Sequence, residues 1–349
     1  MSTPRAASIS GFPEWLPSER IVELAVLDTA RSIFELHGFA SIETRSVEPL
    51  SELLRKGEID KEVYVLRRLH AAPTEADPGL GLHFDLTVPL ARYVLANAGH
   101  LDFPFRRYQI QKVWRGERPQ EGRSREFTQA DIDIVDRTDL AFHHEVEMAV
   151  VMSSLLAALP IPPAVIHVSN RKLAEGFYRA IGAPDPAAVL QVIDKLDKIG
   201  PEATARMLVE GAGLPAKAAD QCLELASICS ADASFAERVG ALGVGSALLE
   251  EGITELAAVI EGVNAQRPGS VVADLRIARG LDYYTGTVYE TVLVGHEHVG
   301  SIASGGRYDT LASDTKTTYP GVGISLGVTR LVTVLLNREL VSASRSVPS

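Results

Sequence analysis

The sequence of 349 residues lacks several features that define whole classes of protein. It contains no apolar run of about 18 residues, so no membrane-spanning helix is expected. Its N-terminal stretch, MSTPRAASISGFPEW, lacks the apolar core of a secretion signal. Only two cysteines occur, Cys222 and Cys229, which is too few for a disulfide or metal framework. Together these absences predict a cytoplasmic protein with reduced cysteines.

The sequence also lacks an excess of positive charge. Its net charge of −11 argues against non-specific coating of nucleic acid, because that affinity comes from neutralising phosphates with Lys and Arg. Any contact with a nucleic acid is therefore expected to be local. With 46% hydrophobic and 23% charged residues, the chain is typical of a globular protein with a large core and a subordinate domain.

The most informative stretch is residues 105 to 136, which predicts two β-strands, about 106 to 114 and about 127 to 135, joined by a long loop. Both strands alternate in polarity, so each has one polar face. On the second strand the polar face consists of Gln129, Asp131 and Asp133. The alternative interpretation is an ordinary hairpin with one solvated face.

The loop between these strands is basic. Its four arginines predict an anion-binding site: Arg115, Arg118, Arg123 and Arg125. Fixed positive charge next to a carboxylate and a carboxamide suits a zwitterion held beside a phosphate.

Upstream of the hairpin, residues 14 to 37 predict an amphipathic helix, and residues 39 to 49 predict a strand that ends at a proline. A further strand is expected at residues 61 to 69. After a polar turn, residues 82 to 88 predict a strand, and Pro89 opens a helix.

Asp85 and Thr87 are expected to share one face of the strand at residues 82 to 88. They are candidate ligand-binding side chains, and the alternative for Thr87 is a helix cap.

Downstream of the hairpin, residues 139 to 158 predict a helix that includes His143 and His144. Adjacent helical side chains point about 100° apart and cannot easily share one ion, so no metal site is expected. A strand at residues 164 to 170 leads into an Ala-rich, helix-patterned segment, residues 171 to 265. This segment is the predicted second domain.

The stretch VVADLRIARGLDYYTGTVYETVLVG predicts a strand at residues 271 to 277, a turn at Thr285-Gly286 and a second strand at residues 287 to 293. Arg279 stands beside Gly280 at the end of the first strand, where glycine permits close approach of a ligand. Tyr283 and Tyr284 lie in the turn, either as binding side chains or as packing residues.

Two more segments follow. SIASGGRYDTL, residues 301 to 311, predicts a strand that enters a Gly-Gly turn with Arg307 and Tyr308. Residues 319 to 340 predict a Gly-rich strand that passes into a helix, with Arg330 near the start of the helix.

Several of these motifs resemble those of one family. RRYQIQKVWRGERPQEGRSREFTQADIDIV resembles motif 2 of the class II aminoacyl-tRNA synthetases, in the form found in histidine-tRNA ligases, and RGLDYYTGTVYE is similar to a motif specific to those ligases. Residues 18 to 49 resemble motif 1, which builds a dimer interface, and residues 319 to 340 resemble motif 3. The resemblance runs from Gly11 to about Leu340.

The resemblance implies an α+β fold, an antiparallel sheet flanked by helices. It places a class II catalytic domain at residues 1 to 170 and 266 to 349, with a helical insertion domain at residues 171 to 265. The family normally continues into an anticodon-binding domain, which this sequence lacks, and it often has Arg at the position of His83.

The implied activity is activation of L-histidine with ATP to histidyl-adenylate, followed by transfer to tRNA(His). In this resemblance Arg115 contacts the α-phosphate and the substrate carboxylate, Arg279 the α-phosphate as charge develops, and Arg330 the γ-phosphate, while Mg²⁺ bridges the β- and γ-oxygens. Arg123 is a further implied ATP contact. The implied histidine-binding residues are Asp85, Thr87, Arg115, Gln129, Asp133, Arg279, Tyr283, Tyr284 and Tyr308.

Two alternatives stay open. Lack of an anticodon-binding domain is a feature of the regulatory subunit of ATP phosphoribosyltransferase, a catalytically inactive relative. A stand-alone enzyme that forms histidyl-adenylate for a non-tRNA acceptor is the other. Intact motifs favour the ligase, which the resemblance implies to be a homodimer that contacts the acceptor arm of tRNA(His) weakly.

Overall fold

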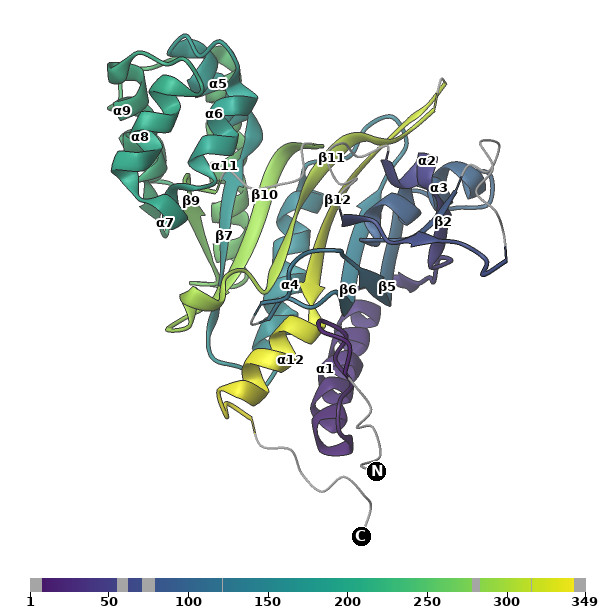
Figure 1. Cartoon of the computed structure of the whole chain (residues 1–349). Coiled ribbons are helices and arrows are strands. Elements are labelled where there is room, and N and C mark those ends of the chain that lie inside the picture. Colours follow the sequence, from purple (N-terminus) through teal and green to yellow (C-terminus); the bar gives the residue numbers. More distant parts are fainter. Residues whose placement is uncertain are drawn as a thin grey trace.

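The fold is taken from a computed structural model, and Figure 1 shows its arrangement: long strands through the middle, helices along the sheet, and a group of helices at one side. The structure describes residues 8–54, 62–70, 79–120, 122–277, 283–314 and 316–341.

Within these residues, nine strands form the main sheet in the order β1-β5-β6-β12-β11-β10-β7-β9-β8. Neighbours from β5 through β7 pair antiparallel, whereas β1·β5 and β7·β9 are parallel. The predicted antiparallel sheet is therefore confirmed. The strands are β1 (Ala40–Ser41), β5 (Phe105–Trp114), β6 (Glu126–Val135), β7 (Ala164–Asn170), β8 (Cys229–Ser230), β9 (Val271–Asp274), β10 (Tyr284–Leu293), β11 (Ala303–Ser313) and β12 (Thr318–Gly327).

A small antiparallel sheet lies beside the main one and corrects two predictions. Its order is β2-β4-β3, and its elements are β2 (Val47–Pro49), β3 (Val65–Leu66), β4 (Leu80–Leu82) and the short helix α2 (Leu50–Leu53). The strand predicted at residues 39 to 49 is divided, because β1 joins the main sheet and β2 the small one. The strand predicted at residues 61 to 69 is confined to β3.

The strand predicted at residues 82 to 88 is also wrong in extent. Helix α3 (Thr87–Asn97) begins before Pro89, so Asp85 lies in the connection and Thr87 is the first helical residue. The physical reason is a local hydrogen bond: Oδ1 of Asp85 accepts the N–H of Val88 at 3.1 Å. A carboxylate that satisfies a free N–H of the first turn stabilises the start of a helix. Asp85, rather than Thr87, therefore supplies the cap.

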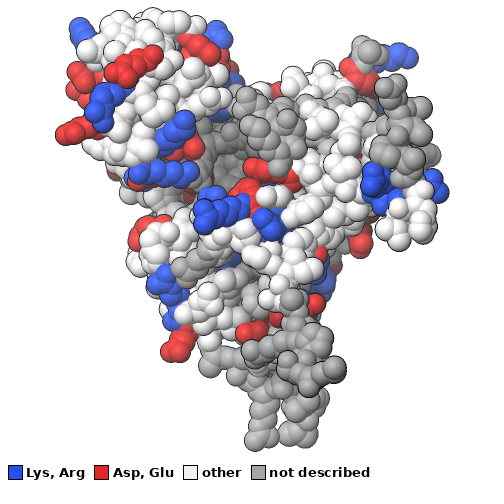
Figure 2. All heavy atoms as spheres, viewed as in Figure 1, with Lys and Arg blue, Asp and Glu red and all other residues white. Residues whose placement is uncertain are grey.

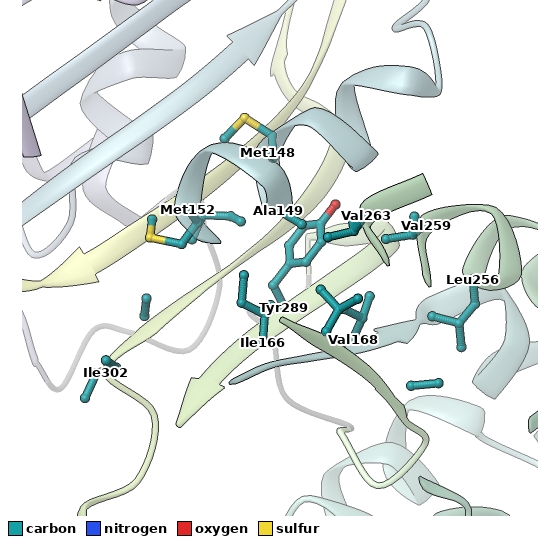
Figure 3. Packing of buried hydrophobic residues seen from close by; sticks show 14 of the residues in the cluster. Met148, Ala149, Met152, Ile166, Val168, Leu256, Val259, Val263, Tyr289 and Ile302 are labelled. Carbon is teal, nitrogen blue, oxygen red and sulfur yellow. The ribbon is translucent and has the colours of Figure 1, made fainter. Parts of the chain in front are cut away.

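Three long helices pack on the main sheet, namely α1 (Pro17–Leu36), α4 (His143–Ala158) and α12 (Val328–Asn337). They agree with the helices predicted from apolar periodicity. In Figure 3, Met148 and Met152 of α4 lie over Tyr289 and Ile166 of the sheet, with the side chains of α11 (Ala247–Asn264) close by. The hydroxyl of Tyr289 donates to the backbone oxygen of Glu145 at 2.7 Å, so this polar group is satisfied inside the core.

Residues 171 to 264 are mainly helical, as predicted. The helices are α5 (Arg171–Ala180), α6 (Pro186–Ile193), α7 (Leu196–Ile199), α8 (Pro201–Glu210), α9 (Ala216–Ala226), α10 (Phe235–Gly240) and α11 (Ala247–Asn264). Helices α5 and α11 cross closely, because a Cβ atom on Gly252 would lie 2.2 Å from the backbone nitrogen of Leu173. Both cysteines are free; Cys222 is buried and Cys229 is exposed. A short 3₁₀ helix, η3 (Glu297–Val299), joins β10 to β11.

Candidate active site

The main sheet carries a buried carboxylate held by two donors. Asp133 on β6 lies in register with Arg107 on β5 and Gly323 on β12. Nη2 of Arg107 is 2.6 Å from Oδ2 of Asp133, and the hydroxyl of Tyr308 on β11 donates to Oδ1 at 2.7 Å. Four neighbouring strands thus fix one side chain.

Gly323 is required by this arrangement. A Cβ atom at this position would lie 2.0 Å from Oδ1 of Asp133, which no real contact allows. Only glycine lets the carboxylate lie across the adjacent strand.

The polar face of β6 is buried, which contradicts the interpretation of a solvated hairpin face. Gln129, Asp131 and Asp133 are each less than a tenth exposed. Nε2 of Gln129 donates to Oγ of Ser325 at 2.7 Å. Burial raises the pKa of the Asp131 carboxyl to about 7, with Arg107 acting in the opposite direction. Burying such groups is costly without partners, so this face is suited to a polar ligand.

Arg107 was missed as a site residue by the sequence reasoning. Its side chain is fully buried, and its Nη2 also donates to the backbone oxygen of Leu86 at 3.4 Å. This contact brings the loop that carries Asp85 beside Asp133. The signal was the alternation of β5, which puts Arg107 on the same face as Gln109.

Three tyrosines gather next to this carboxylate. The ring centroids of Tyr283 and Tyr284 are 4.6 Å apart, and those of Tyr283 and Tyr308 are 6.1 Å apart. Burial raises the pKa of all three hydroxyls, so they stay neutral and act as hydrogen-bond donors or acceptors at neutral pH. The structure therefore brings these three predicted residues together.

Two turns predicted in this region are wrong. Thr285-Gly286 lies within β10, and the Gly305-Gly306 pair lies within β11. The glycines serve close strand packing: a Cβ atom on Gly306 would lie 2.9 Å from the ring of Tyr284. The strand predicted at residues 271 to 277 ends at Asp274.

The predicted arginines lie around the same region. Nε of Arg115 donates to the backbone oxygen of Phe84 at 3.0 Å, and its guanidinium lies 5.1 Å from the ring centroid of Phe127. Arg330 donates to the backbone oxygen of Ser301. Arg279 lies outside the described residues.

The basic loop reaches the start of α12. A Cβ atom on Gly122 would lie 3.2 Å from Cγ of Arg330, and the N–H of Thr128 donates to Oγ1 of Thr329 at 2.8 Å. Arg123 of this loop is partly exposed, with Nη1 at 3.6 Å from Oε2 of Glu117. Figure 2 shows acidic atoms gathered in a hollow of this face, with Lys and Arg atoms at its rim.

Two buried histidines, His83 and His144, have structural contacts that explain their positions. His83 is buried, stacks on Trp114 with ring centroids 5.6 Å apart, and places Nε2 2.7 Å from the backbone oxygen of Lys112. Burial lowers its pKa. Nδ1 of His144 is within hydrogen-bond distance of Oε2 of Glu147, at 3.1 Å. Among the residues that the structure describes, no group of three His, Cys, Asp or Glu side chains is placed to hold a metal ion.

This antiparallel sheet, with the arginine-rich loop between β5 and β6 and with Arg330 on α12, agrees with the class II aminoacyl-tRNA synthetase catalytic unit that the sequence motifs resemble. The comparisons are specific: the sequence model for histidyl-tRNA synthetase matches residues 11–331, and the chain belongs to the histidyl-tRNA synthetase family.

Curated relatives are similar over nearly the whole chain. The histidine–tRNA ligase of Micrococcus luteus is 62% identical over 356 residues, which cover 99% of this chain and 78% of the relative. That of Cutibacterium acnes is 61% identical, again with 99% and 78% covered.

Solved structures agree. Histidyl-tRNA synthetase from a Nostoc species has a TM-score of 0.87 at 36% identity, covering 99% of this chain and 79% of that one. A Bacillus halodurans structure, described as an ATP phosphoribosyltransferase regulatory subunit/histidyl-tRNA synthetase, has a TM-score of 0.80 at 19% identity, covering 95% and 84%, and shows the fold alone. No helix in the described part of the chain is long and apolar enough to span a membrane.

Proposed function

We propose that the chain activates L-histidine with ATP, releasing diphosphate, and transfers histidine from histidyl-adenylate to tRNA(His). The observation that carries this proposal is the buried Asp133 on β6, held by Arg107 and Tyr308 of the same sheet. A buried carboxylate with a fixed position is a suitable acceptor for an imidazole N–H. Family membership favours this activity over a regulatory subunit or a non-tRNA acceptor.

The proposed catalytic residues are the arginines. The transition state gathers negative charge on phosphate oxygens, and fixed cations stabilise that charge. Arg115 contacts the α-phosphate and the histidine carboxylate, Arg330 the γ-phosphate, and Arg279 the α-phosphate as charge develops. Arg123 contacts ATP from the loop, and its partial exposure and long distance to Glu117 leave it able to reorient.

We infer that Mg²⁺ arrives as part of the substrate Mg·ATP, because Mg²⁺ is usually held by substrate phosphates, waters and one or two carboxylates. For histidine, Asp85, Thr87 and Gln129 receive the α-amino group. Asp133, Tyr283, Tyr284 and Tyr308 surround the imidazole, and the close contact of the three tyrosine rings supports that placement.

We further propose that residues 1 to 170 and 266 to 349 form the catalytic domain, that residues 171 to 265 are an insertion near the tRNA acceptor arm, and that the protein is cytoplasmic.

A two-fold homodimer through motif 1 is also proposed. Exposed apolar side chains on and around the small sheet support the proposal that a second copy of the chain covers this surface. They are Leu54, Val65, Leu66, Leu69 and Leu80. Light scattering at micromolar concentration should give a dimer mass, and an active monomer would refute this assembly.

Two reactions measured on one preparation test the function. Exchange of labelled diphosphate into ATP should depend on histidine and on no other standard amino acid. Charging of tRNA(His) tests the second step. Histidine binding without exchange would favour the regulatory subunit, and exchange without charging at any tRNA concentration would favour another acceptor.

A further inference from the structure

One buried carboxylate of the site has no assigned role. Asp131 is 3% exposed and lies on β6 between Gln129 and Asp133, on the same face of the strand. Within the described ranges, its Oδ1 has no hydrogen-bond partner, and neither has Oε1 of Gln129. A buried acceptor without a donor costs free energy, so two such acceptors on one face indicate that a ligand supplies the donors.

The charge balance shows what kind of ligand fits. Arg107 carries one positive charge, and its Nη2 lies 2.6 Å from Asp133 and 4.0 Å from Asp131, each measured to Oδ2. One guanidinium therefore faces two carboxylates, and Asp85 lies on the adjoining loop. The group has excess negative charge when both aspartates are ionised, and a cation neutralises it.

Within the proposed function, on which this inference rests, we propose that Asp131 is a further histidine-binding residue that accepts a hydrogen bond from the α-ammonium group of the substrate. Arg107 is a positioning residue, because it holds Asp133 and faces Asp131. An ammonium offers three N–H donors, and the three expected acceptors are Oδ1 of Asp131, Oε1 of Gln129 and the carboxylate of Asp85. The Cα atoms of Asp131 and Gln129 are about 7 Å apart along the strand.

This placement couples histidine binding to the release of a proton from Asp131. The groups that face Asp131 are Arg107 from β5, Asp133 from β6, Asp85 from the loop, Tyr284 from β10 and the hydroxyl of Ser325 from β12. In the protein without ligand, burial raises the pKa of Asp131 to about 7, so this carboxyl is partly protonated at neutral pH. A bound ammonium favours the ionised form, lowers that pKa and releases a proton.

Calorimetry of histidine binding to the full chain tests the proposal, at pH 7 in two buffers that differ in ionisation enthalpy. Wild-type protein should release a proton on binding histidine. The Asp131→Asn variant should release less and bind histidine about 10- to 100-fold more weakly, with ATP affinity unchanged. Equal histidine affinity and equal proton release in the folded variant would overturn the proposal.

A second measurement needs no variant. Imidazolepropionate lacks the ammonium group, so wild-type protein should bind it without the extra proton release. The same release with histidine and with this analogue would also overturn the proposal. If wild-type protein binds no histidine at all, the proposed function itself fails, which is a separate outcome.

Discussion

The β5–β6 hairpin and the helical segment from α5 to α11 bury their side chains in opposite ways. The buried polar and charged side chains of the hairpin are Arg107, Gln109, Thr128, Gln129, Asp131 and Asp133. In the described helical segment, Thr204 is the buried polar side chain, and its hydroxyl donates to the backbone oxygen of Gly200 at 2.8 Å. Burying charge destabilises a fold unless it is paired. The difference indicates that packing explains the helices, whereas the hairpin retains two buried acceptors, Oδ1 of Asp131 and Oε1 of Gln129, that suit a polar ligand.

The largest effect is expected at Asp133. Asp133→Asn leaves the buried Arg107 without its carboxylate and removes the charged acceptor for the imidazole. Histidine affinity should fall by up to about 10⁴-fold, while ATP affinity changes much less. Calorimetry with each ligand measures both. Asp139→Asn, at an exposed position after β6, is the matched control, and an equal loss for both ligands would make Asp133 structural.

A core substitution in the helical segment should change stability and leave activity unchanged. Phe235 is fully buried in α10, so Phe235→Ala should lower the free energy of unfolding by about 3–5 kcal/mol. Histidine-dependent exchange by the folded fraction should persist. Thermal unfolding and exchange assays on the same sample separate these effects, and a folded variant without exchange would contradict the distinction between the regions.

A substitution at Arg115 should lower activity and leave stability nearly unchanged. Arg115→Ala should reduce the rate of diphosphate exchange by about 10²- to 10³-fold, because one preorganised donor to the developing charge is lost. Its melting temperature should change little. Arg31→Ala on the exposed side of α1 serves as the control. Normal exchange by folded Arg115→Ala would remove the assignment.

The smallest effect is a pH dependence of stability. The pKa of Asp131 is about 7 in the folded chain and about 3.9 in an unfolded one. The folded state therefore holds an extra proton between these values, and stability is lost as pH rises through about 4 to 7. Asp131→Asn should raise stability by about 1–3 kcal/mol at pH 8 and by less at pH 5. Equal gains at both pH values in thermal unfolding would show that Asp131 does not titrate.

Local patterns predicted the long elements well. Helix α1, the hairpin and the passage from β12 into α12 follow from periodicity, because each buries a continuous apolar face. Short elements were predicted less well. The division between β1 and β2 depends on which sheet each joins, and the start of α3 depends on one hydrogen bond from Asp85.

Site residues on recognisable motifs were also found from sequence, whereas Arg107 was not. Alternation places Arg107 on the polar face of β5, but its role depends on pairing with Asp133 on the neighbouring strand β6, and the pattern of β5 does not show that partner. The burial of Gln129 and Asp131 was missed as well, because it depends on side chains of neighbouring strands, namely Ser325 on β12 and Arg107 on β5.

Amide hydrogen exchange with and without saturating histidine tests the contrast between the two regions most directly. Histidine should slow exchange in β6, β12 and the start of β10, and leave α6, α8 and α9 unchanged, because bound ligands stabilise the elements that hold them. Protection confined to the helical segment, or no protection in the sheet at saturating histidine, would contradict the account.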